Sequence, residues 1–310
     1  MSVKKNGKIK ERGKDKLFVI INNVLLLAFL LVELYPILYV LSASISDAKA
    51  VSSGKMWLLP VDISLDGYRY VLHYKEIWIG YANTIFYTVA GTLINLALTL
   101  PAAYALSRKD FRDKGIFMVI FMFTMYFSGG LIPSYLNIRS LGLINTRTVL
   151  LISGGVAVYN MIVARTFFAN SIPWELHEAA KIDGAGNFMI FFRIVLPLSA
   201  PIIAVMALYY GVGHWNDYFQ AMIYVANNRE KWPLQLFLRE ILNQSKWAAE
   251  AMTGSENMSA SEMVYLSQQA DMANKLKYCV IVVATAPMLI IYPRLQKFFD
   301  KGIMIGSVKG

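Results

Sequence analysis

The sequence predicts an all-α membrane protein with six transmembrane helices, and three observations support this fold class. Hydrophobic residues make up 56% of the 310 residues and charged residues 16%, whereas soluble proteins average about 45–50% and about 25%. The mean hydropathy is +0.46. Six apolar runs are each long enough for a hydrocarbon core of about 30 Å, which takes roughly 17–25 helical residues. The runs are Leu17–Leu41, Tyr81–Leu106, Ile116–Leu136, Thr148–Phe168, Leu198–Val225 and Leu276–Pro293.

The runs are expected to be helices, because in lipid every backbone N–H and C=O group needs a partner. Their polar residues lack the two-residue alternation of barrel strands. The first run follows the basic segment 1–16, so a cleaved signal peptide is the alternative there. A signal h-region has only about 7–15 residues, and we therefore interpret 17–80 as an uncleaved span with an outer loop. Residues 81–300 form the core, and 301–310 a tail.

Lys and Arg are unevenly distributed between alternate loops, which predicts the orientation. One set of segments holds 18 of them in 75 positions and the other set holds 12 in 105. The richer set is 1–16, 107–115, 165–197 and 294–310, and the poorer set is 42–80, 137–147 and 223–277. Cytoplasmic loops carry the excess, so both termini are predicted to be cytoplasmic. Basic flanks beside anionic headgroups explain the formal charge of +10 without nucleic acid.

Glycine and proline interrupt the third run at Gly129, Gly130 and Pro133. A gating kink is one interpretation, although both residue types are ordinary in membrane helices. The outer loop 223–277 is too long for a bare turn. From its residues alone it is interpreted as a solvated loop.

The loop 169–197 contains a short charged helix between two apolar runs. Pro173 suits a first helical turn, and Gly184 supplies a stop. The predicted helix Pro173–Asp183 would be roughly 16 Å long at 1.5 Å per residue. Leu176, Ala179, Ala180 and Asp183 fall at i, i+3, i+4 and i+7, which gives one shallow face of small residues. The helix either rests on lipid headgroups or contacts a partner.

Polar and aromatic residues gather near the outer half of the fifth run. Tyr210, His214, Asp217 and Tyr218 follow i, i+4, i+7 and i+8, and Trp215 and Asn216 flank them. Aromatic faces with hydrogen-bonding tips suit a sugar pathway. The alternative is an interfacial aromatic belt with a hydrogen-bond network that holds the helices together.

The sequence contains none of the catalytic or metal-binding motifs considered below. The chain lacks G-x-x-x-x-G-K-[ST], so ATP hydrolysis would have to come from a partner. HEAAK has Lys181 where the zinc motif H-E-x-x-H needs its second histidine. No G-x-S-x-G elbow occurs, and the single Cys279 permits no intrachain disulfide. The chain is therefore not expected to be an enzyme, to bind a metal or to hold a cofactor.

A longer pattern around the charged helix resembles a known family. Glu178-Ala179-Ala180, then Gly184, then Ile194 and Leu196-Pro197, is similar to the EAA loop of membrane subunits of bacterial ATP-binding-cassette importers. The stretches 83–115, 127–136, 215–225 and 302–310 resemble the carbohydrate-uptake branch, on the side of the maltose-type second permease and its LplC-like relatives.

This resemblance implies a type I importer (MetI-like) transmembrane domain in the bacterial inner membrane. It implies that the helix docks on an ATPase dimer, with Glu178 as charged anchor, Ala179 and Ala180 allowing close contact, and Asp183 and Gly184 making the turn. The partners would be a second permease, the ATPase with its ATP and Mg²⁺, an extracytoplasmic solute-binding protein, lipid and an oligosaccharide. The resemblance also implies that the outer loop 223–277 is the docking surface for the solute-binding protein. A secondary transporter or channel acting alone, or a non-transporting scaffold or sensor subunit, remains the alternative.

Overall fold

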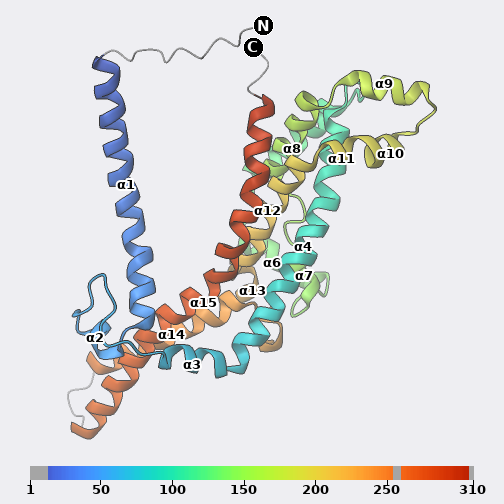
Figure 1. Cartoon of the computed structure of the whole chain (residues 1–310). Coiled ribbons are helices and arrows are strands. Elements are labelled where there is room, and N and C mark those ends of the chain that lie inside the picture. The colour runs from blue at the N-terminus through green and yellow to red at the C-terminus, as the bar shows by residue number, and fades with distance from the viewer. Residues whose placement is uncertain (1–12, 254–259, 307–310) are drawn as a thin grey trace. The chain divides into compact units, whose positions relative to one another are not determined.

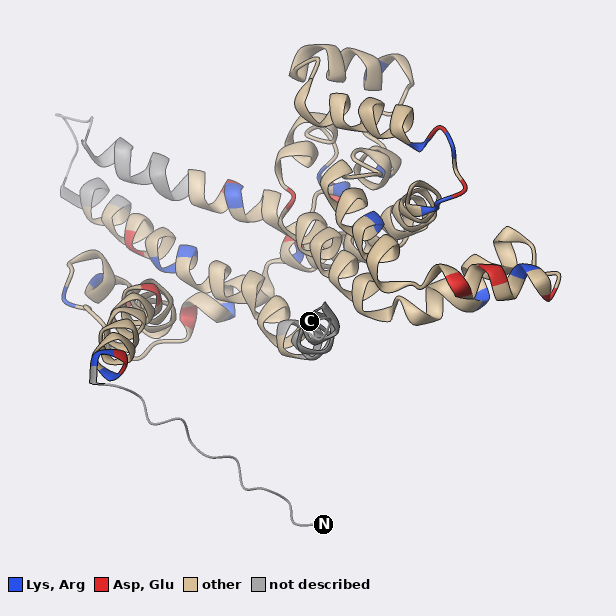
Figure 2. Cartoon of the chain, turned by 90° about the horizontal axis from the view of Figure 1, so that it is seen from above, with Lys and Arg blue, Asp and Glu red and all other residues tan. Residues whose placement is uncertain are grey.

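The computed structural model describes residues 13–253 and 260–306, and every regular element in these ranges is helical. The chain divides into two compact units. One comprises Met1–Tyr70 and Ser245–Val282, and the other comprises Val71–Gln244 and Val283–Gly310. Figure 1 shows the helices of both units, and each unit is described by itself below. Figure 2 shows that the long helices are mostly free of charged residues, as spans in lipid require.

The first unit contains the long helix α1 (Gly13–Ile45), which includes the first predicted run. None of its most apolar window is buried within the chain. The short helix α2 (Ala48–Ser52) and the start of α3 (Asp66–His73) follow. Helices α14 (Leu234–Thr253) and α15 (Ala260–Gly306) contribute residues to both units.

The second unit is built around α4 (Lys75–Ser107), which packs along α12 (Ala200–Asn216) and α8 (Val158–Ser171). Its main core lies between these three helices and includes Leu100, Met161 and Met206. The other elements are α5 (Lys114–Tyr126), α6 (Leu131–Ser140), α7 (Arg147–Ile152), α9 (Trp174–Ile182), α10 (Asn187–Ile190), the π-helical turn η1 (Phe191–Val195), α11 (Leu196–Leu198), α13 (Phe219–Tyr224) and the 3₁₀ turn η2 (Arg229–Lys231).

The helical fold class is confirmed, whereas the count of six uninterrupted spans is not. In the described residues three helices are long and apolar enough to cross a membrane, or up to five spans exist if each bent pair counts once. The third run is bent by 111° between α5 and α6. Gly130 sits at this break with a φ of +88°, so the predicted kink is present. The bend makes α6 leave the direction of α5.

The fourth and fifth runs are also interrupted. Residues 153–157 separate α7 from α8, because a Ser-Gly-Gly sequence weakens the helix and Gly154 adopts a φ of +79°. The fifth run is interrupted at Asp217 and Tyr218, between the end of α12 at Asn216 and the start of α13 at Phe219. An 82° bend precedes α12.

The predicted outer loop 223–277 is largely helical, since it contains η2, α14 and the start of α15. Residues 254–259 of this loop lie outside the described residues, as do 1–12 of the basic N-terminus and 307–310 of the tail.

Candidate functional site

The predicted charged helix exists as α9, two residues shorter than expected. Pro173 is its N-cap and Asp183 its C-cap. Gly184 follows with a φ of +80°, a conformation that glycine adopts at no steric cost, so the predicted stop is present. Its N–H donates to Lys181 O at 3.0 Å, and Ala185 N donates to Ala180 O at 2.9 Å. These two bonds form a Schellman motif, which fixes the turn out of the helix.

The predicted single face of small residues is wrong in one respect. Ala180 is buried in the main core of the second unit, whereas Leu176, Ala179 and Asp183 are exposed. The buried side of α9 is centred on His177 and Ala180, which are three residues apart. The face was predicted from residue spacing alone, and spacing does not determine which side of a helix packs against the rest of the chain.

An aromatic stack holds the buried side of α9. The His177 ring lies between Trp174, at 4.9 Å and 17°, and Tyr104 of α4, at 5.8 Å and 14°. His177 is only 5% exposed, and burial lowers the pKa of its imidazole. The buried ring is therefore favoured in its neutral form. The stack attaches α9 to the end of α4.

An ionic contact attaches the exposed side of α9 to the segment after α4. Asp110 lies 2.6 Å from an Arg108 guanidinium nitrogen and 3.0 Å from Lys181 Nζ. The hydrogen bonds from Arg108 hold the pKa of the Asp110 carboxyl well below its usual range. The carboxylate therefore stays charged at neutral pH, and it joins the helix to the 108–113 segment.

Once these contacts are made, α9 presents a free surface. Glu178 and Ala179 are exposed, Ile182 is 86% exposed, and Phe188 on the following helix is 82% exposed. In Figure 1, α9 and α10 lie at the end of the second unit where α4 finishes. We name Glu178, Ala179, Ile182 and Phe188 the α9 surface. Large apolar side chains beside a carboxylate are typical of a protein interaction site.

The residues Ile194, Leu196 and Pro197, which complete the EAA-like pattern, lie after α10. Ile194 and Leu196 are partly buried against the main core, and Pro197 is exposed in the short helix α11. The π-helical turn η1 begins directly after α10. Pro197 lacks the N–H group that a regular helix would use there, and the chain then turns into α12.

Within the span region, the predicted polar residues of the fifth run contact the break at 153–157. Tyr210 is buried, and its Oη shares a hydrogen bond of 2.6 Å with Thr99 Oγ1 of α4. The same Oη accepts from Ala157 N at 3.1 Å. A backbone N–H that the interrupted helix leaves open is thereby satisfied, as lipid requires.

A second bridge uses His214 and Asn95. His214 Nε2 donates to Asn95 Oδ1 at 2.7 Å. Asn95 Nδ2 in turn donates to Gly155 O at 2.9 Å and to Gly154 O at 3.3 Å. A Cβ on Gly91 would come within 2.4 Å of His214 Nε2, so this glycine is what lets α12 approach α4. Asn95 therefore joins α4, α12 and the break.

The remaining predicted residues make other contacts within the chain. Trp215 is buried and its Nε1 donates to Ala284 O at 3.1 Å. Asn216 Nδ2 donates to Val212 O of its own helix at 3.1 Å, and Asp217 Oδ1 accepts from Gln220 N at 3.2 Å. Tyr218 is exposed, and the Arg239 guanidinium lies 4.9 Å from its ring centre. Asn216 and Tyr218 thus keep surface free for another molecule.

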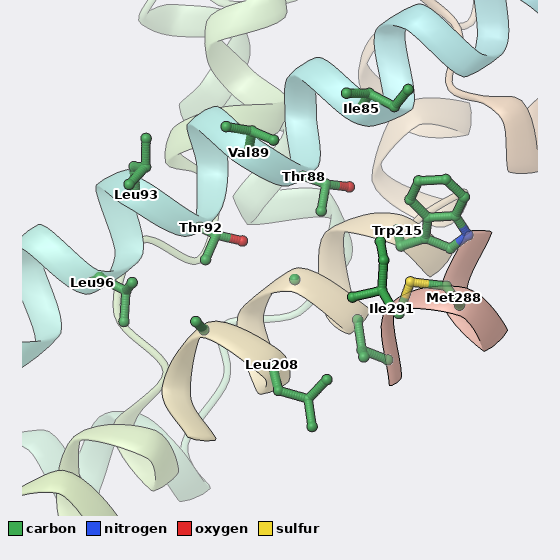
Figure 3. Close-up of a pocket in the computed structure, with 13 residues that line it drawn as sticks. Ile85, Thr88, Val89, Thr92, Leu93, Leu96, Leu208, Trp215, Met288 and Ile291 are labelled. Atoms are coloured by element: carbon green, nitrogen blue, oxygen red, sulfur yellow. The ribbon is translucent and has the colours of Figure 1, made fainter. Parts of the chain in front are cut away.

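An apolar groove of about 360 Å³ runs beside this network between α4, α12 and α15. Figure 3 shows Thr88 and Thr92 of α4 among its lining residues, with Leu208 and Trp215 of α12. The two hydroxyls are buried and have no hydrogen-bond partner among the described residues. Two hydroxyls are few for a sugar, which needs many polar contacts, so this groove does not by itself form a sugar site.

Sequence reasoning missed Asn95, Thr99, Arg108 and Asp110. A signal existed for the first pair, because two amide or hydroxyl side chains at i and i+4 inside an apolar run lie on one helix face. The second pair sits in an ordinary charged loop, and only the fold brings Lys181 to it.

A family model described as "Binding-protein-dependent transport system inner membrane component" matches residues 77–305. A polygalacturonan/rhamnogalacturonan transport system permease protein, YtcP, of Bacillus subtilis (strain 168) is 41% identical over 297 residues, which is 96% of this chain and 100% of the relative. Protein LplC of the same organism is 38% identical over 279 residues, 90% of each chain.

A solved structure is also similar. It is the crystal structure of a bacterial ABC transporter involved in the import of the acidic polysaccharide alginate. The match has a TM-score of 0.81 at 38% sequence identity, and it covers 94% of this chain and 100% of that chain.

Proposed function

The chain belongs to the family of binding-protein-dependent transport system inner membrane components, and from that membership we propose that it is the permease subunit of an ATP-driven oligosaccharide importer whose α9 surface couples it to the ATPase. The observation that carries the coupling role is the exposure of Glu178, Ala179, Ile182 and Phe188 on a helix that is fixed at its base. A rigid base is needed if force at the surface is to reach the spans.

Each contact of α9 has a place in this proposal. Glu178 attracts a basic side chain of the ATPase, and a charge-assisted hydrogen bond is about twice as strong as a neutral one. Ala179 allows close approach, and Ile182 and Phe188 supply apolar area. Ala180 acts differently from the sequence expectation, because it packs inward. ATP and Mg²⁺ bind to the partner ATPase, since this chain has no phosphate-binding motif.

The proposed complex also contains a second permease and an extracytoplasmic solute-binding protein. The family description itself supports dependence on a binding protein. The fully exposed apolar surface of α1 supports lipid or a second permease as its neighbour. We expect six membrane crossings, with the third, fourth and fifth broken as described, and both termini in the cytoplasm. The excess of Lys and Arg in alternate loops supports this orientation.

The pathway residues divide into two groups in this proposal. Tyr210, His214 and Trp215 hold the wall of the pathway, because their polar atoms are bonded to neighbouring elements. Asn216 and Tyr218 contact the passing sugar, and their exposed side chains support this role. Asp217, half-buried, caps the start of α13 through Gln220 N. The relatives' names support a substrate released from an acidic polysaccharide.

The proposal is tested by reversing the charge of Glu178. Glu178→Lys should leave the permease in the membrane but abolish retention of the ATPase and uptake of acidic oligosaccharide. Glu175→Lys is the matched control, because Glu175 is exposed on the same helix outside the EAA pattern. Normal ATPase binding and uptake in Glu178→Lys would contradict the coupling role. Absence of substrate-stimulated ATP hydrolysis in the native complex would contradict the importer function itself.

A further inference from the structure

The segment between α1 and α3 exposes large apolar side chains although it is well folded. Trp57, Leu59 and Ile63 are 72%, 75% and 74% exposed. Their neighbour Met56 is buried in a small core with Ala43 and Val51. The exposure is therefore a property of a folded surface, and not of a segment without contacts.

Hydrogen bonds hold this segment beside the last turns of α1. Ser42 Oγ donates to Leu58 O at 2.6 Å. Further along, Val61 N donates to Ser46 Oγ at 3.1 Å and Ser64 N donates to Ile45 O at 2.9 Å. Consecutive Cα atoms are about 3.8 Å apart, so the residues on either side of Leu58 lie at the level of Ser42. Figure 1 shows the segment alongside this end of α1.

That level corresponds to the edge of the hydrocarbon core. The window of α1 that gives it a hydropathy of 2.5 has no residue buried in the chain. The run Leu17–Leu41 extends over about 37 Å as a helix, slightly more than a hydrocarbon core of about 30 Å. Ser42 is the first polar residue after it. Trp57 and Leu59 therefore lie where hydrocarbon gives way to headgroups.

We propose that Trp57, Leu59 and Ile63 form an interfacial anchor that inserts into the phospholipid headgroup region at the end of α1. Tryptophan is enriched at this depth, because its ring is apolar while its N–H needs a polar partner. A phospholipid surface fits better than a protein partner, since the segment is continuous with the exposed apolar surface of α1.

The anchor also bears on the part of α15 in the same unit. Lys275 of α15 is buried, and its Nζ donates to Ser64 O at 3.0 Å and to Ser64 Oγ at 2.7 Å. Cys279 Sγ donates to Ser44 O at 3.2 Å. Insertion of the segment into the interface would thus set the depth of α1 and of this stretch of α15 together.

The test measures the depth of single spin labels on the full transport complex in proteoliposomes. In a Cys279→Ser background, which keeps a donor for Ser44 O, cysteine is placed at Trp57 or Leu59 for labelling. Ser53 is the matched control, because it is exposed in the same segment but polar. For each label, the collision rate with oxygen is divided by the collision rate with a water-soluble nickel chelate. This ratio should be several times higher for the labels at 57 and 59 than for the label at 53.

Two results would overturn the anchor. Nickel accessibility at 57 and 59 equal to that at 53 would mean that water covers the surface. Protection from both oxygen and nickel would mean that a protein subunit covers it. A labelled variant that fails to assemble is replaced by one labelled at Ile63, for which the same readings apply.

Discussion

Replacing Gly184 by valine tests whether the shape of the turn after α9 is needed for coupling. Gly184 has a φ of +80°, and a Cβ placed on it would meet no described atom within 4 Å. The cost of a side chain is therefore confined to the backbone. Holding a non-glycine residue in this region costs about 1–3 kcal/mol, which corresponds to a change of about 5–150-fold in an equilibrium. The turn then populates other conformations, and the α9 surface loses its fixed position.

The assay compares Gly184→Val with Gly186→Val in the assembled complex. Gly186 is also in open space but has a φ of −73°, so valine fits there without strain. Both chains should insert, and Gly186→Val should retain the ATPase and transport sugar. Gly184→Val should lose uptake by a factor in the stated range, together with retention of the ATPase. Equal behaviour of the two variants would refute the argument from backbone geometry.

Three further predictions concern contacts within the second unit. Asn95→Leu leaves the carbonyl groups of the break at 153–157 without their donor, which costs about 1–3 kcal/mol for each unsatisfied buried group. The thermal midpoint of the complex, measured by differential scanning fluorimetry, should therefore fall. An unchanged midpoint would contradict the bridging role. Because burial lowers the pKa of His177 from its ordinary 6.5, the neutral ring stabilises the docked helix fully above that pH and less as the pH falls below it. ATPase retention should therefore decline as the pH falls from about 6.5 to about 5.5 in the native complex but not in His177→Phe, and equal pH profiles would argue against it. Trp215→Ala removes a buried ring, at about 3–5 kcal/mol, and should impair assembly, whereas Tyr218→Ala removes an exposed ring and should assemble, hydrolyse ATP and transport less sugar; the reverse pattern would exchange their roles.

Local sequence patterns predicted the charged helix α9 well. Proline before it and glycine after it each act through their own backbone, so the start, the stop and the positive φ of Gly184 could be inferred from neighbouring residues. Its buried side could not, because Tyr104 and Asp110 meet α9 only through the fold.

Apolar length predicted where the spans lie but not whether they are straight. Hydropathy counts side chains, whereas a helix is interrupted when backbone groups find other partners. The break at 153–157 persists because Asn95 and Tyr210, distant in sequence, bond to its carbonyl and N–H groups. A hydropathy pattern contains no information on such partners.

Helix α4 connects the two parts of the candidate site. At its end Tyr104 stacks on His177 of α9, and nine residues earlier Asn95 holds the break at 153–157. Nine residues of helix are about 13.5 Å, and α4 is helical throughout this stretch, with Pro101 inside it. A proline removes one backbone hydrogen bond of a helix, so α4 can hinge at Pro101 between the two positions. Under the proposed coupling role, movement of α9 against the ATPase would displace the end of α4 and strain the hydrogen bonds at the break, where the backbone lacks regular helical bonds. The interrupted fourth span is thus the element on which coupling at α9 would act first.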